Sequence, residues 1–108
     1  MTSEAFQDLL HPITQAIAAR PVDQALASAL NQAFPADGET FEGIHQACRQ
    51  AIAAGWMCAE GGPGRRFGRV IEAGAGTGGL SVDVVDMENI VGPHHRHPTG
   101  EICMIMPQ

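Results

Sequence analysis

Apolar residues in the first half of the chain recur at the spacing of helices. Between residues 3 and 19 they lie three or four positions apart, which places them on one face of a helix. The same spacing predicts helices over about residues 22–34 and 39–54, the last of them ending at Gly55. Pro12 predicts a kink in the first helix, or two abutting helices. Helices this short cannot bury their apolar faces alone, so they must pack on one another and on the C-terminal half of the chain.

The second half of the chain has the short apolar runs and, at residues 80–85, the alternating pattern that are typical of strands. Residues 61–66, rich in glycine and arginine, predict a loop that separates the helical part from a β part. Strands are expected at residues 67–72, 80–85 and 102–106. This pattern favours antiparallel β-structure that is buried on at least one side. The predicted fold is therefore α+β, with an N-terminal helical region at residues 1–60 packed on a β region at 61–108.

A glycine-rich segment at residues 73–79 is similar to the first motif of S-adenosylmethionine-dependent methyltransferases. That site requires a helix directly after the glycines and a parallel sheet around them. Here the next residues, 80–86, alternate and are rich in β-branched side chains, which favours a strand. The predicted helices also precede the glycines instead of alternating with strands. We therefore interpret residues 73–79 as a hairpin connection.

Composition excludes several classes of protein. The chain has 108 residues, a formal net charge of −6 and no lysine, which argues for one domain and against a nucleic-acid partner. It has no apolar run of the roughly 20 residues that span a bilayer, and no signal peptide is expected. Its three cysteines lack the spacing of a disulfide framework or a zinc ribbon, which predicts buried thiols in a reducing compartment. We expect a soluble cytoplasmic protein.

The densest chemistry lies in residues 94–101, where three histidines and a glutamate fall within eight positions. On a strand, His95 and His97 point to the same face because side chains alternate. A turn at residues 98–100 would bring Glu101 back beneath them. Two imidazoles and one carboxylate suit a divalent transition metal with open positions, though the metal's identity stays open. The alternative is a histidine cluster solvated on a loop.

The pattern His95-x-His97-x3-Glu101 is similar to the first metal-binding motif of the cupins, which are small antiparallel β-barrels. More narrowly, the helical N-terminal part followed by Ser81–Met87 and Gly92–Pro107 resembles the 4-hydroxylaminobenzoate lyase family. The resemblance implies a cupin-like sheet or partial barrel. It also implies the conversion of 4-hydroxylaminobenzoate to protocatechuate with release of ammonium, a step in bacterial breakdown of nitroaromatic compounds.

The resemblance suggests a role for each candidate residue. His95, His97 and Glu101 would be the catalytic residues and the metal ligands, and without metal a protonated histidine would act as general acid. Arg65 or Arg96 would hold the carboxylate of a small aromatic acid through a bidentate pair. Arg65 has a second interpretation as part of a solvated loop tip, and strand alternation points Arg96 away from the two histidines.

Two departures from the cupin pattern shape the remaining expectations. Asn89 and Gln108 stand where cupins usually have glycine, and no second cupin motif follows. We therefore expect either a truncated form of a longer protein or a barrel that neighbouring chains complete. An apolar edge strand at residues 102–106 would leave unpaired backbone groups, which predicts a homo-oligomer.

Two other functions remain open. One is a metal-dependent cupin dioxygenase, since two histidines and a carboxylate also suit non-haem iron. The other is a non-catalytic cupin-like module that binds a small acid. Oxygen consumption with a catechol would favour the first, and binding without turnover would favour the second.

Overall fold

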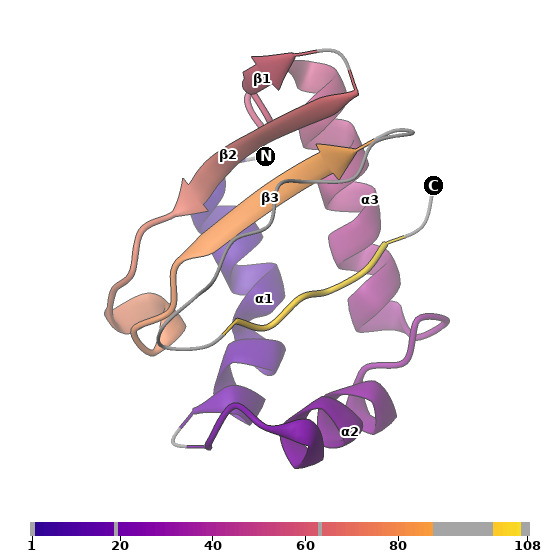
Figure 1. Cartoon of the computed structure of the whole chain (residues 1–108), viewed down its shortest axis with the longest axis vertical. Helices are drawn as coiled ribbons and strands as arrows, with labels where there is room; N and C mark the ends of the chain where they lie inside the picture. Colours follow the sequence, from indigo (N-terminus) through magenta and orange to yellow (C-terminus); the bar gives the residue numbers. More distant parts are fainter. Residues whose placement is uncertain (1, 19, 63, 88–100, 107–108) are drawn as a thin grey trace.

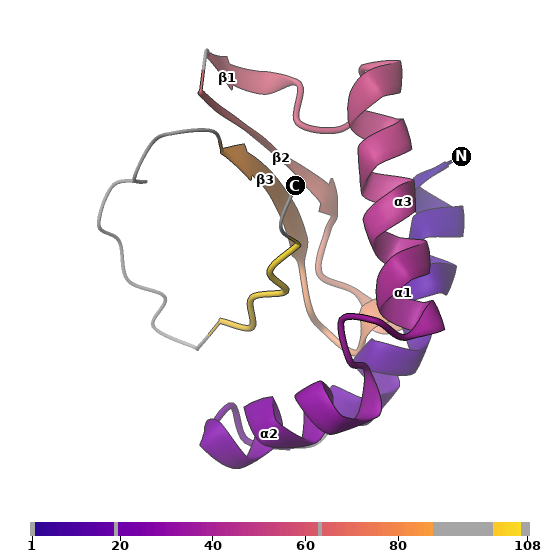
Figure 2. The ribbon, with the colours of Figure 1, turned by 90° about the vertical axis from the view of Figure 1, so that its right-hand side faces the viewer.

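The computed structural model describes residues 2–18, 20–62, 64–87 and 101–106. Within these residues, three helices come first: α1 (Ser3–Ile17), α2 (Gln24–Ala33) and α3 (Glu39–Ala54). An antiparallel sheet comes next, made of β1 (Glu60–Gly62), β2 (Arg65–Ile71) and β3 (Val82–Met87) (Figure 1). Helices α1 and α3 cover one face of the sheet, and α2 lies beyond its lower end (Figure 2). The predicted α+β class is confirmed.

Local signals explain where the helices begin and end. The Thr2 hydroxyl accepts a hydrogen bond from the Ala5 N–H at 3.1 Å, and the Asp23 carboxylate accepts one from the Leu26 N–H at 2.9 Å. These bonds cap the first turns of α1 and α2. Gly55 ends α3 in the left-handed region, with φ of 89°. The three predicted helices are confirmed, and α1 is one helix that contains Pro12, not two abutting ones.

The core lies between α1, α3 and the inner face of the sheet. Phe6 from α1 and Ile44 from α3 are 1% and 2% exposed, and they belong to one apolar cluster with Val84 of β3. Val82 and Val84 point inward, whereas Asp83, Val85 and Met87 are exposed. The alternation predicted for this strand is therefore confirmed. None of the helices described in the structure is both long and apolar enough to cross a membrane.

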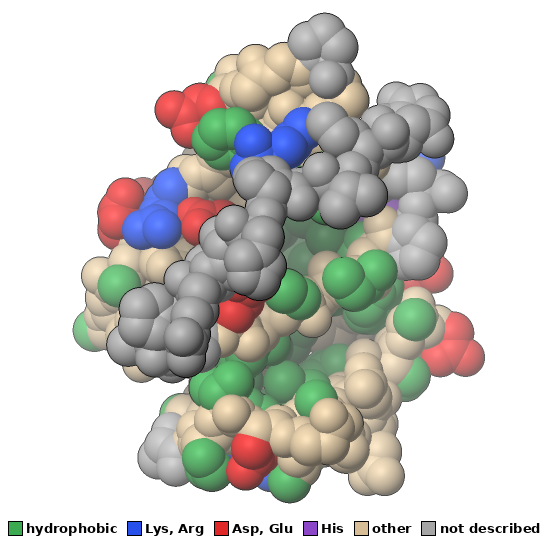
Figure 3. Space-filling model, viewed as in Figure 1, with side chains coloured by type: hydrophobic (Ala, Val, Ile, Leu, Met, Phe, Trp, Pro, Cys, Tyr) green, Lys and Arg blue, Asp and Glu red, His purple; other side chains and the backbone are tan. Residues whose placement is uncertain are grey.

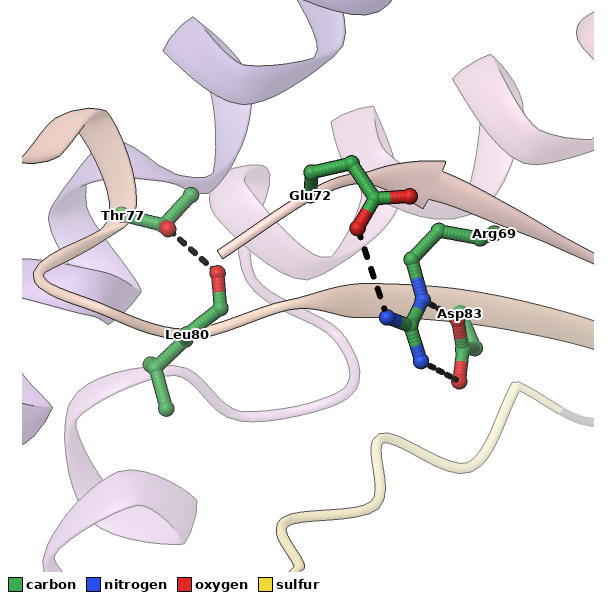
Figure 4. A network of polar contacts seen from close by, with 5 residues as sticks. All are labelled: Arg69, Glu72, Thr77, Leu80 and Asp83. Carbon is green, nitrogen blue, oxygen red and sulfur yellow. Dashed lines mark hydrogen bonds and ion pairs between the residues drawn. The ribbon is translucent and has the colours of Figure 1, made fainter. Parts of the chain in front are cut away.

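The glycine-rich segment joins β2 to β3 through a short 3₁₀ helix, η1 (Ala75–Thr77). Thr77 is 1% exposed, and its hydroxyl donates to the carbonyl oxygens of Gly74 and Leu80. Figure 4 shows the contact with Leu80. Because β2 and β3 are antiparallel neighbours, this segment is the predicted hairpin connection. The methyltransferase alternative is wrong, since within the described part of the chain the glycines lead into β3 instead of a long helix and the sheet is antiparallel.

Two expectations about the sheet are wrong. Residues 61–66 are not only a loop: Gly61 pairs with Arg66 in a β1–β2 hairpin, and Gly61 has φ of 99°. Residues 101–106 form no strand, although their apolar run predicts one at 102–106. A run of apolar residues favours an extended shape, but a strand also needs a hydrogen-bonded neighbour. The described residues form an open three-stranded sheet, so the partial barrel and the homo-oligomer stay predictions.

The register between β2 and β3 shows which residues of β2 point away from the helices. Arg65, Phe67 and Arg69 lie opposite Met87, Val85 and Asp83, the three outward-facing residues of β3. Directly opposed residues of an antiparallel pair share a face. We call this side, opposite α1 and α3, the outer face of the sheet. A bulge between Arg69 and Ile71 restores Ile71 to the core, where it is 8% exposed.

Candidate functional site

The predicted site residues divide into two groups. His95, Arg96 and His97 lie outside the described residues, so their roles stay predictions. Glu101 and Arg65 are described, Glu101 at the start of the C-terminal segment and Arg65 at the start of β2. The structure therefore gives the surroundings of one predicted metal ligand and of one predicted substrate-binding residue.

Glu101 is exposed, and a neighbouring thiol bonds to it. Cys103 donates a hydrogen bond to a carboxylate oxygen of Glu101, with Sγ and Oε1 2.8 Å apart. In an extended chain, residues two apart lie on the same side, which explains this contact. The hydrogen bond raises the pKa of the Cys103 thiol, with smaller contributions from burial and from the charge of Glu101. The contact between Cys103 and Glu101 was not predicted, although a spacing of two residues in an extended chain indicates that they share a side.

The described residues do not form a metal site by themselves. Within residues 2–87 and 101–106, apart from 19 and 63, no three histidine, cysteine or acidic residues are grouped closely enough to hold a metal ion. Glu101 presents an exposed carboxylate, and Cys103 adds a soft sulfur beside it. The metal site of His95, His97 and Glu101 therefore stays a prediction.

Arg65 lies on the outer face next to an aromatic ring. Its guanidinium carbon is 4.8 Å from the centroid of the Phe67 ring, a cation–π contact. Both side chains are half-buried. Among the described residues, no carboxylate lies within ion-pair distance of Arg65. The guanidinium is thus ordered by Phe67, and within this part of the chain its N–H donors remain available for an anion.

Arg69 lies two residues beyond Phe67 on the same face and, unlike Arg65, is bonded to carboxylates. Its Nε lies 2.6 Å from Oδ1 of Asp83, its Nη2 lies 3.3 Å from Oδ2, and its Nη1 lies 3.5 Å from a carboxylate oxygen of Glu72 (Figure 4). The hydrogen bond and charge of Asp83 raise the pKa of Arg69 above its ordinary value. The Arg69 guanidinium is therefore bonded to two carboxylates, and its pair with Asp83 links β2 to β3.

Cys48 and Cys58 are buried free thiols, as predicted, whereas Cys103 is exposed and corrects that expectation. Cys58 has φ of 57°, and its thiol donates to the Val84 carbonyl oxygen at 3.4 Å. Burial raises the pKa of Cys48 from 9.0 to about 11, with a smaller effect from the charge of Cys58. Burial is also the main cause of the raised pKa of Cys58.

These thiols predict a loss of stability in alkaline solution. Because the pKa of Cys48 is raised on folding, the unfolded chain loses this proton first, and the free energy of unfolding falls as the pH rises from 9.0 to about 11. The chain has no lysine or tyrosine, so its thiols are the main side chains that titrate in this range. Urea unfolding at several pH values measures the decline. Cys48→Ala should make it shallower, and an identical decline in the variant would contradict the assignment.

Other polar groups lie apart from the predicted site. His45 is half-buried, as predicted, and its ring forms a T-shaped contact with the Phe41 ring. Its Nε2 has no hydrogen-bond partner among the described residues. A hollow of about 290 Å³ lies beside Trp56, between the α3–β1 connection and β2. A smaller one of about 190 Å³ lies between Arg49 of α3 and Asp86 of β3. Neither hollow is lined by a described residue that is predicted to bind substrate or metal.

Comparisons with known proteins agree with the resemblance seen in the motifs. The sequence profile of the family described as PnbB, 4-hydroxylaminobenzoate lyase, matches residues 8–108. A 4-hydroxylaminobenzoate lyase from Pseudomonas putida is 30% identical over 91 residues, which are 72% of this chain and 52% of that protein. The chain thus spans about half the length of this relative. No solved structure matches. Because the profile covers nearly all of the sequence, the chain belongs to the PnbB family of 4-hydroxylaminobenzoate lyases.

Proposed function

We propose that the protein converts 4-hydroxylaminobenzoate to protocatechuate and releases ammonium, as a step in the breakdown of nitroaromatic compounds. The observation that carries the proposal is the extent of the family match. It runs through residue 108 and so includes His95, His97 and Glu101, the residues whose pattern predicts acid–base or metal chemistry. A small aromatic acid is accordingly the expected substrate.

The proposed reaction adds one water to the substrate and releases one ammonia, with no external oxidant. The N–O bond breaks heterolytically, and its oxygen leaves with a proton as water. Water then adds to the ring carbon next to the one that carries the nitrogen, and a second water hydrolyses the resulting imine. Loss of ammonia and a proton shift give the catechol. The difficult step is N–O cleavage, because hydroxide is a poor leaving group unless it is protonated or bound to a Lewis acid.

The residues of this chain suit that step. A protonated imidazole of His95 or His97 would donate the proton that leaves with the hydroxylamine oxygen. The same two histidines and Glu101 would hold a divalent metal, which when bound supplies Lewis-acid stabilisation of that oxygen. Arg65, with no carboxylate partner among the described residues, is available to pair with the substrate carboxylate. Arg96 remains a second candidate for that role.

The test is turnover of 4-hydroxylaminobenzoate by the purified protein without oxygen. We expect ammonium and protocatechuate to form in equal amounts, because the reaction needs water and no oxidant. Product formation that requires oxygen would contradict the proposal and indicate a dioxygenase. Binding of the substrate without any product would contradict it as well and indicate a binding module.

A further inference from the structure

The outer face of the sheet carries the Arg65 guanidinium beside a strip of apolar side chains. Among the described residues, this guanidinium has no carboxylate partner. Arg65 and Phe67 of β2 lie directly opposite Met87 and Val85 of β3. Met87 is 49% exposed and Val85 is 51% exposed, so both present apolar surface to solvent. Seen from this side, basic side chains lie over the upper part of the sheet (Figure 3). These four residues therefore place a guanidinium at one end of an apolar surface.

Charge distinguishes Arg65 from Arg69 on the same face. Arg69 is held by Asp83 and Glu72, so binding an anion there would mean displacing carboxylates that are already bonded. Arg65 has no such partner in the part of the chain that the structure describes, and the Phe67 ring orders its guanidinium at 4.8 Å. A planar guanidinium binds a carboxylate through two parallel hydrogen bonds. The complementary ligand is thus an anion that carries an apolar or aromatic body.

Chain connectivity relates this surface to the predicted catalytic segment. Met87, the cross-strand partner of Arg65, is the last residue of β3, and the segment that carries His95 and His97 comes directly after it in the sequence. Residues 101–106, which begin with Glu101, then run along the free side of β3 in the direction of that strand (Figures 1 and 2). The proposed catalytic histidines therefore follow, in the sequence, the end of β3 that carries Met87 on the outer face.

We infer that Arg65, Phe67, Val85 and Met87 form a ring platform that binds the aromatic carboxylate substrate. Arg65 pairs with the carboxylate, and Phe67 contacts the aromatic ring, which Val85 and Met87 cover along β3. Phe67, Val85 and Met87 are new assignments and act as specificity-determining residues. The inference rests on the proposed function for its substrate class, but its binding test needs no turnover.

The test measures binding of 4-aminobenzoate, which keeps the ring and carboxylate but has no N–O bond to break. Titration calorimetry on the 108-residue chain should show that Arg65→Met weakens binding by about 10- to 100-fold, the effect of one charge-assisted hydrogen-bonded pair. Arg65→Lys should weaken it less, because the charge remains. Phe67→Leu should cost about 2- to 10-fold. Binding of aniline, which lacks the carboxylate, should respond to Phe67→Leu and not to Arg65→Met.

Arg66→Met is the matched control, because Arg66 is the next residue in β2 but lies opposite Asp86, on the other face of the sheet. Equal losses in Arg66→Met and Arg65→Met would overturn the ring platform, as would failure of the wild-type chain to bind millimolar 4-aminobenzoate. Unchanged binding by Arg65→Met and Phe67→Leu, beside normal ammonium release, would overturn the platform and leave the proposed function standing. Weakened binding in both variants, with no ammonium release by the wild type, would support the platform and refute the lyase.

Discussion

Phe6→Ala should lower the free energy of unfolding by about 3–5 kcal/mol, the usual cost of removing a buried phenylalanine. Phe6 is 1% exposed and lies in the cluster that joins α1 to α3 and to the inner face of the sheet. The variant loses transfer free energy and leaves a cavity that these elements cannot all close. The free energy of unfolding of a domain of this size is about 5–15 kcal/mol in total, so this one substitution removes a large share of it. Urea unfolding followed by the fluorescence of Trp56 measures the loss.

Val22→Ala is the control for this substitution. Val22 is 49% exposed, so removing its methyl groups should change the free energy of unfolding by no more than about 0.5 kcal/mol. A loss below about 1 kcal/mol in Phe6→Ala would mean that α1 does not pack on the sheet as described.

Much of the fold is determined by local patterns in the sequence. Helical spacing predicts α1 and α3, alternation predicts β3, and Gly55 marks the end of α3. Strand β1 escapes prediction because Glu60–Gly62 is glycine-rich and carries no alternating pattern. Its pairing with Arg65–Phe67 depends on the turn between the two strands. The strand predicted at 102–106 is wrong for a related reason: an apolar run is a local signal, whereas strand pairing needs a partner at the right register.

The candidate site is harder to predict because charge pairing depends on that register. Arg65 and Arg69 look alike in the sequence, since both are arginines in an apolar strand. The β2–β3 register places Arg69 opposite Asp83 and Arg65 opposite Met87, which decides which guanidinium can accept an anion. Composition predicts a buried Cys103, yet this thiol is exposed and bonded to Glu101.

His97→Ala should lower the rate of ammonium release from 4-hydroxylaminobenzoate by about 10²- to 10⁴-fold, the range for removal of a general acid. The physical reason is that heterolysis of the N–O bond needs a proton or a Lewis acid at the departing oxygen, and His97 would contribute to either. The fold should be unaffected, because Phe6, Ile44 and the other core residues lie elsewhere in the chain.

His94→Ala is the matched control, because the strand alternation expected from the sequence predicts that His94 points away from His95 and His97. The decisive measurement is therefore the initial rate of ammonium release by the wild type, His97→Ala and His94→Ala, at one substrate concentration and without oxygen. We predict a rate near that of the wild type for His94→Ala and a loss of at least about 100-fold for His97→Ala. Equal rates in His97→Ala and the wild type would contradict the assignment of the catalytic site.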